Sequence, residues 1–167
     1  MQKRLNKLQL GLILCSSFLL IVLDQLSKVW VRNNFTVGES GLEVGIIRIT
    51  HVTNSGASFG FFSNQSTVLS IVNIIIVIGI IIVIRYLPCI TKLNMIAAGL
   101  VIGGAIGNLS DRFQFGYITD FIDIRLWGNF HWPVFNLADS AIVIGTAVIS
   151  ISLVLSSIQE RRHEQYS

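Results

Sequence analysis

Apolar residues along this chain gather into four long runs, separated by polar stretches. A helix needs about 20 mostly apolar residues to cross a hydrocarbon core of about 30 Å. The runs at 67–84 and 140–158 meet this length alone. Those at 8–23 and 95–109 meet it if polar residues at their ends lie near membrane depth. The pattern predicts an all-α membrane protein with four transmembrane helices, at about residues 8–28, 67–86, 93–110 and 137–158.

Composition supports this interpretation. Only 13% of residues are charged and the mean hydropathy is +0.70, whereas about a quarter of the residues in a soluble domain are charged. The run at 74–84 is rich in β-branched residues, which could suggest a β-strand. The run is too long for a strand and does not alternate, and an open sheet edge is not tolerated in lipid, so we interpret it as a helix. With no linker or repeat in the sequence, we expect residues 1–167 to form one integral membrane domain.

The first apolar run has basic residues before it, as a signal peptide would. No small-x-small cleavage pattern follows its core; Asp24, Gln25 and Lys28 follow instead. We therefore interpret this segment as an uncleaved helix.

Lysine and arginine set the predicted orientation, because they are denser in cytoplasmic loops. Seven of the 12 basic residues fall in the two short tails and the loop between the second and third runs. Both termini are therefore predicted to be cytoplasmic, and the long connections at 31–66 and 110–139 extracytoplasmic. The net charge of +3 follows from this arrangement and does not indicate a nucleic-acid partner.

The first long connection carries its own signals. Residues 45–52 are rich in β-branched side chains and predict a strand, and Asn54-Ser55-Gly56 predicts a turn. The connection is too short to enclose a core, so we expect it to lie on the membrane surface. Aromatic residues on the same predicted side would lie at the headgroup level; they are Trp30, Phe59, Phe61, Phe62, Trp127 and Trp132.

Polar residues crowd at the predicted outer end of the bundle, where charges near membrane depth are costly and mark functional candidates. They are Asp24, Lys28, Asn108, Asp111, Arg112, Asp120, Asp123, Asn136 and Asp139. Each also has an ordinary interpretation. Asp24 with Lys28 and Asp111 with Arg112 suit structural ion pairs, Asp120 and Asp123 suit solvated loop acids, and Asp139 suits a helix cap.

The third run carries glycines at the four-residue spacing that lets another helix approach closely; they are Gly99, Gly103 and Gly107, with Gly104 alongside. We interpret this pattern as packing. Such packing would bring Asn108, Asp111 and Arg112 against another helix.

Several aspartates converging at a partly dry site suit peptide hydrolysis, in which two carboxyl groups share one proton and need no cofactor. The cysteines, Cys15 and Cys89, and the scattered histidines show no metal-ligand spacing, and we expect neither a metal nor a disulfide. The residues alone leave a second possibility open, a proton-coupled transporter.

Five motifs, in order, resemble those of bacterial lipoprotein signal peptidase (signal peptidase II). They are Asp24-Gln25-x-x-Lys28; Asn54-x-Gly56-Ala57-x-Phe59-Gly60; the stretch 103–112 from Gly103 to Arg112; Gly116-x-x-x-Asp120-Phe121; and Phe135-Asn136-Leu137-Ala138-Asp139-Ser140-Ala141. The length and the four-helix layout match too. The one departure is Ser110, where an apolar residue is usual.

The resemblance implies a membrane-embedded aspartic endopeptidase without a cofactor. It would cut prolipoproteins just before a cysteine that carries a diacylglyceryl group, at the outer face of the bacterial cytoplasmic membrane. It implies catalytic residues at Asp120 and Asp139. Supporting or substrate-binding residues are implied at Asp24, Lys28, Asn54, Gly56, Asn108, Asp111, Arg112 and Asn136. A small extracytoplasmic β-cradle, a short surface helix, contact with membrane lipid and a monomeric state complete these expectations.

Overall fold

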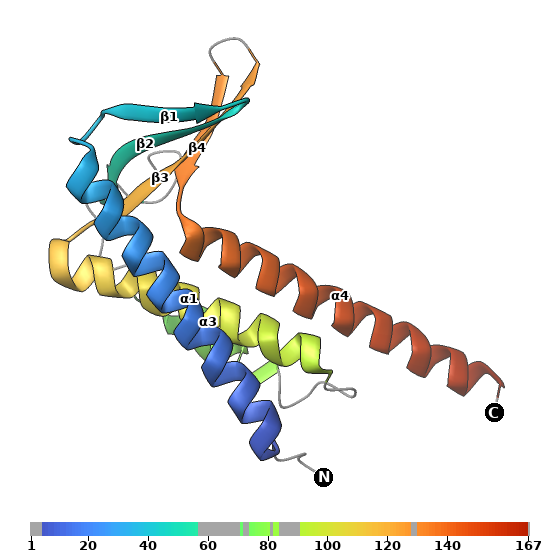
Figure 1. Ribbon diagram of the computed structural model, residues 1–167. Coiled ribbons are helices and arrows are strands. Elements are labelled where there is room, and N and C mark those ends of the chain that lie inside the picture. The colour runs from blue at the N-terminus through green and yellow to red at the C-terminus, as the bar shows by residue number, and fades with distance from the viewer. Residues whose placement is uncertain are drawn as a thin grey trace.

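The fold consists of long helices with a small antiparallel sheet at one end (Figure 1). This computed structural model describes residues 5–56, 71, 74–80, 82–83, 91–127 and 130–166. The elements, in order, are α1 (Lys7–Asn34), β1 (Ser40–Val44), β2 (Ile47–Asn54), α3 (Lys92–Phe115), β3 (Ile118–Trp127), β4 (Phe130–Phe135) and α4 (Leu137–Tyr166). Both chain ends lie at the end of the molecule away from the sheet (Figure 1).

Among the described residues, three helices are long and apolar enough to cross a membrane: Lys7–Asn34, Lys92–Phe115 and Leu137–Gln159. They correspond to the first, third and fourth predicted spans, and each extends beyond the predicted bounds. For the second predicted span, residues 74–80 are helical, but 67–70, 72–73, 81 and 84–86 lie outside the described residues. The second predicted span, and with it the total of four, therefore stays a prediction.

The four strands form one sheet in the order β1-β2-β3-β4, with every neighbouring pair antiparallel. The strand predicted at 45–52 is β2. No strand was predicted at the residues of β1, β3 or β4. Helices α1 and α3 run further than their predicted ends at residues 28 and 110. The expected short surface helix stays untested, because residues 57–70, with Phe59, Phe61 and Phe62, lie outside the described part of the chain.

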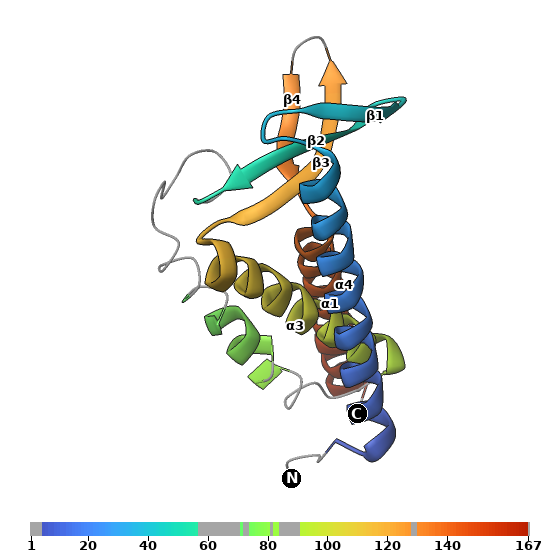
Figure 2. The same cartoon turned by 60° about the vertical axis from the view of Figure 1, so that its left-hand side comes forward.

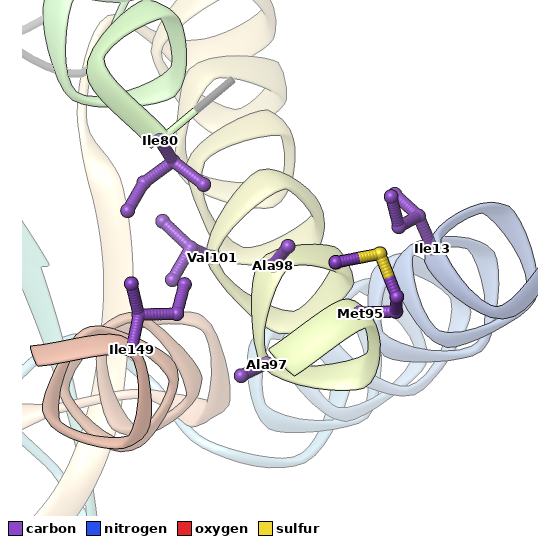
Figure 3. Packing of buried hydrophobic residues seen from close by; sticks show 7 residues of the cluster. All are labelled: Ile13, Ile80, Met95, Ala97, Ala98, Val101 and Ile149. Carbon is purple, nitrogen blue, oxygen red and sulfur yellow. The ribbon is translucent and has the colours of Figure 1, made fainter. Parts of the chain in front are cut away.

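Helix α3 lies between α1 and α4 and supplies four of the seven residues in the buried apolar cluster of the described chain. Figure 3 shows Met95, Ala98 and Val101 on α3, with Ile13 of α1 to one side and Ile149 of α4 to the other. Ile80, from the second apolar run, packs against the same cluster. Outward-facing apolar side chains are exposed along α1 and α4, as expected of helices that face lipid rather than water.

The glycines of α3 allow this close packing. A Cβ at Gly103 would lie 2.7 Å from the Ser17 carbonyl oxygen on α1. On the neighbouring face, a Cβ at Gly104 would lie 2.6 Å from the Ala138 carbonyl oxygen on α4. The interpretation of the glycine pattern as packing is confirmed, because α3 meets two helices through backbone that leaves no room for a methyl group.

Replacement of Gly103 by alanine is expected to destabilise the bundle. Forcing a methyl group into a packed site typically costs about 1–3 kcal/mol, so Gly103→Ala should lower the melting temperature in detergent. Gly11→Ala is the matched control, because nothing lies within 4 Å of a Cβ there and a helical alanine gains roughly 0.5–1 kcal/mol over glycine. Equal melting temperatures for Gly103→Ala and the unaltered protein would contradict the packing argument.

Candidate active site

Helices α1, α3 and α4 each join the sheet at one end (Figures 1 and 2). Polar side chains from these helices and from two strands meet there. The structure brings together nearly all of the predicted site residues. Asp24 and Lys28 come from α1, Asn108, Asp111 and Arg112 from α3, Asn136 and Asp139 from the start of α4, Asp120 from β3, and Asn54 from the end of β2.

Lys28 lies at the centre of this group and is fully buried. Its Nζ is 2.8 Å from Asp24 Oδ2 and 3.4 Å from Asp111 Oδ2, and it donates to Asn108 Oδ1 at 3.0 Å. An ammonium group out of water is tolerated only when it is paired and hydrogen-bonded. Lys28 thereby ties α1 to α3.

The two acids beside Lys28 use their remaining oxygens to hold neighbouring backbone. Asp24 Oδ1 accepts from the Ala138 amide in the first turn of α4 at 3.1 Å. Asp111 Oδ2 accepts from the Thr119 amide of β3 at 2.9 Å. Asp24 and Lys28 thus form a buried ion pair, and the interpretation that its role is structural stays a prediction. The expected pair of Asp111 with Arg112 is not formed, because Asp111 turns to Lys28 and, at 3.7 Å, to Arg32.

Asp139 is positioned by the beginning of α4. The Asp139 amide donates to Asn136 Oδ1 at 2.9 Å, while Asp139 Oδ2 accepts from the Asn136 amide at 3.3 Å. This reciprocal arrangement is a capping box, which satisfies two amides that have no partner within the helix. Asn108 Nδ2 donates to the other oxygen, Oδ1, at 2.8 Å, so both oxygens of the carboxyl group are fixed.

Asp120 lies on β3 rather than in a loop, and it is 1% exposed. Asn54 Nδ2 donates to its Oδ2 at 2.8 Å, and Asn136 Nδ2 donates to its Oδ1 at 2.7 Å. Burial, and then the negative charge of Asp139, raise the pKa of Asp120 to about 7 despite these hydrogen bonds. A carboxyl group in this state can hold a proton near neutral pH.

Two asparagines join the two carboxyl groups into one network. Asn136 donates to Asp120 through Nδ2 and caps α4 together with Asp139. Its Nδ2 also lies 3.2 Å from Asn108 Oδ1, and Asn108 in turn donates to Asp139. Two carboxyl groups that are joined through such a network, and of which the charge of one acts on the other, can activate water and protonate a leaving group if they share one proton.

Arg112 and the turn after β2 border this network. The charges of Asp139 and Asp120 both act on the Arg112 guanidinium. Its buried Nε and Nη1 atoms have no hydrogen-bond partner among the described residues. Gly56 contributes its amide, which donates to Asn54 Oδ1 at 3.1 Å; the rest of that motif, from residue 57 onward, lies outside the described residues.

Sequence reasoning missed several members of the site and misjudged one. Gln25, adjacent to Asp24, donates to Asp24, to Asp111 and to the Gly107 carbonyl. Arg32, one turn beyond Lys28, donates to Thr119 Oγ1 at 2.9 Å. Asp123 is not a solvated loop acid but a buried residue of β3. Residues 118–124 are rich in β-branched side chains, and this was the signal that could have predicted the strand; they include Ile118, Thr119, Ile122 and Ile124.

Comparisons with known proteins point to one family. A family model described as signal peptidase (SPase) II matches residues 16–155. The chain is 41% identical over 147 residues to lipoprotein signal peptidase of Moorella thermoacetica, covering 87% of this chain and 95% of that one. It is also 41% identical over 149 residues to the protein of that description from Syntrophomonas wolfei, covering 88% and 96%.

Solved structures agree with this assignment. One bacterial membrane enzyme has a TM-score of 0.77 and 29% sequence identity, over 94% of both chains. Another has a TM-score of 0.74 and 30% identity, over 92% of this chain and 97% of the other. The likeness therefore extends over the helices and the sheet together.

Asp24→Ala is expected to lower the stability and the yield of folded protein as well as activity. It deprives buried Lys28 of its nearest carboxylate, and losing one partner of a buried pair costs about 3–5 kcal/mol. Thermal unfolding and yield in detergent measure this. Glu43→Ala is the matched control, because Glu43 pairs with Arg125 in an exposed contact of about 0–1 kcal/mol. If the Asp24→Asn variant folded normally and yet showed no turnover, the structural role of Asp24 would be contradicted.

Proposed function

The chain belongs to the signal peptidase II family, and from that membership we propose that Asp120 and Asp139 are its two catalytic groups. The protein is an aspartic peptidase of the bacterial membrane that removes signal peptides from prolipoproteins. The observation that carries the proposed pair is the shared network, in which Asn136 and Asn108 connect a buried, protonatable Asp120 to Asp139.

We assign Asp120 as the acid, because its carboxyl group can hold a proton near neutral pH, and Asp139 as the base. Asp139 takes a proton from a water molecule, whose oxygen attacks the scissile carbonyl carbon. Asp120 gives its proton to the carbonyl oxygen as the tetrahedral intermediate forms. When the carbon–nitrogen bond breaks, the proton on Asp139 passes to the departing amine. The intermediate's hydroxyl proton then returns to Asp120 as the new carboxyl end forms, so the pair regains its starting state.

The surrounding residues position this pair and the substrate. Arg112 has two buried donors without partners in the described chain, and these suit the backbone carbonyl groups of an extended peptide. Asn54 and Gly56 border Asp120 on the side of the turn after β2. Asp24, Lys28, Asn108, Asp111 and Asn136 hold the helix ends on which the catalytic groups depend.

The substrate is a prolipoprotein whose cysteine already carries a diacylglyceryl group, and cleavage falls just before that cysteine. Its scissile bond lies at the membrane surface, between an apolar helix and a lipid-anchored residue. A site at the junction of apolar helices and a sheet suits that depth, and exposed apolar side chains on the helices suit contact with the lipid chains. The enzyme acts as a monomeric single domain with four spans.

Both termini are cytoplasmic and the site faces the extracytoplasmic side. This orientation is supported by the basic tails and by the position of both chain ends away from the sheet (Figures 1 and 2).

Asp120→Asn and Asp139→Asn are each expected to give folded, membrane-inserted protein with little turnover of a lipidated precursor. An amide keeps the shape and can still hydrogen-bond, but it cannot relay a proton, and a general acid or base contributes about 10²–10⁴-fold. Cleavage by purified protein in detergent measures this. The double variant should be little worse than either single one, because residues that act as a unit are not additive.

Glu43→Gln is the matched control for these amide substitutions, because it alters an acid on the sheet away from the pair and should keep ordinary turnover. Both single variants should still bind the lipidated precursor. If Asp120→Asn or Asp139→Asn turned over the precursor at the rate of the control, the catalytic assignment would be wrong.

The proposed orientation predicts where fused reporters are active. A reporter that works only in the cytoplasm should be active after Ser167. A reporter that works only after export should be active when inserted at the β1–β2 turn, residues 45–46, and inactive after Ser167. The opposite pattern would reverse the orientation and with it the proposed side of the active site.

A further inference from the structure

Asp123 is a buried acid that takes no part in the network around Asp120 and Asp139. It is 3% exposed and lies three residues after Asp120 on β3. Side chains three apart on a strand point to opposite faces, so Asp123 lies on the face of the sheet away from Asp120. A buried carboxylate with no part in the proposed chemistry calls for another role.

The carboxylate of Asp123 is bound from both neighbouring strands. Arg48 of β2 donates to Oδ2 through Nη2 at 2.6 Å and Nε at 3.0 Å, and Thr50 of β2 donates to the same oxygen at 3.0 Å. On the other side, His131 Nδ1 of β4 lies 2.7 Å from Oδ1. Burial alone would raise the pKa of Asp123, but the hydrogen bonds hold it below its usual value. We call Arg48, Thr50, Asp123 and His131 the sheet lock.

The sheet lock lies where the strand pairing is irregular. Between Ile49↔Ile122 and Val52↔Asp120, β2 advances by three residues while β3 advances by two. Between Ile122↔Phe135 and Ile124↔Trp132, β4 likewise has one residue more than β3. Such bulges interrupt the ladder of backbone hydrogen bonds and re-aim the side chains beyond them. Backbone pairing therefore specifies the register here only weakly.

The register beyond the first bulge decides the surroundings of Asp120. It pairs Val52 with Asp120 and Asn54 with Ile118, which brings the Asn54 amide onto the Asp120 carboxyl at 2.8 Å. A shift of one residue would move these side chains to the wrong face of the sheet. The interactions that fix the position of the first bulge therefore also fix the contacts of the Asp120 side chain.

We propose that Asp123 is a positioning residue, whose contacts with Arg48, Thr50 and His131 fix the bulged register that aims Asp120 at Asp139. The inference rests on the proposed catalytic role of Asp120. Arg48 pairs directly opposite Asp123, and Thr50 falls within the irregular stretch of β2 itself. One carboxylate thus joins β2, β3 and β4 at the point where backbone pairing is interrupted.

Asp123→Asn tests this role in the full-length purified enzyme. An amide oxygen can still accept a hydrogen bond from Arg48, but it carries no negative charge, so the contact with the guanidinium weakens and β3 should shift slightly. A misplacement of about 1 Å can cost about 100-fold, and we expect kcat per folded molecule to fall roughly 10-fold to 100-fold. KM for a lipidated precursor should stay within about twofold, because the sheet lock lies on the face away from Asp120. Arg48→Gln should behave alike, and the double variant should be little worse than either.

The pH profile separates positioning from mere stability. If Asp120 moves away from Asp139 and towards water, both causes of its raised pKa weaken, so the limb of the profile that reports Asp120 should move to lower pH in Asp123→Asn. A variant that merely loses stability would keep the original limb. Arg125→Gln is the matched control, because it breaks an exposed pair with Glu43 on the same sheet, and it should change neither kcat nor the profile.

The outcomes are distinguishable. If folded Asp123→Asn shows the unaltered kcat and pH profile with only a lower melting temperature, the positioning role is refuted. If Asp123→Asn does not fold, Arg48→Gln and His131→Gln decide the matter by the same two readouts. Asp120→Asn is assayed alongside: if it retains activity, the proposed catalytic pair fails, whereas an inactive Asp120→Asn beside a fully active Asp123→Asn refutes only the sheet lock.

Discussion

The buried ammonium group of Lys28 is the constraint on which the rest of the site depends. It is shielded from water near the end of α1 that meets the sheet, so every partner it has must come from the protein. Its three partners each lead to a further element. Asp24 accepts a hydrogen bond from the first turn of α4, and Asp111 accepts one from the backbone of β3. Asn108 donates a hydrogen bond to Asp139. One cation thus sets the relative position of the three long helices and the strand that carries Asp120.

This arrangement also gives the carboxyl groups of one site different surroundings. The two acids nearest Lys28 have their charges compensated by direct contact. Asp120 accepts hydrogen bonds only from the side-chain amides of Asn54 and Asn136 among the described residues, and the negative charge of Asp139 raises its pKa. Amides stabilise a carboxylate less than a cation in contact does, and burial then favours the neutral acid. A protonated carboxyl beside a second one is what peptide hydrolysis without a covalent intermediate requires.

Sequence patterns predicted the parts of the fold that depend on period and composition. Apolar runs predicted α1, α3 and α4, and the glycines of α3 predicted its close packing against neighbouring helices. The ends of the helices were placed too early, because polar residues such as Lys28 and Asp111 read as helix ends when they are in fact buried within helices. β3 was missed because its aspartates interrupt an otherwise typical strand pattern. The pairing of Asp111 with Lys28 instead of Arg112 depends on how α1 and α3 pack, which no local pattern reveals.

The most direct test of the account is a titration of the Asp120 carboxyl group, followed spectroscopically in the purified enzyme and assigned by its loss in Asp120→Asn. In the unaltered protein the group should lose its proton with a midpoint near pH 7. In Asp139→Asn the midpoint should fall, because the nearby charge is gone, but it should stay above the ordinary value of 3.8, because burial, the larger cause, remains. A midpoint near the ordinary value in the unaltered protein, or one that Asp139→Asn leaves unchanged, would contradict the claim that these two carboxyl groups share a proton.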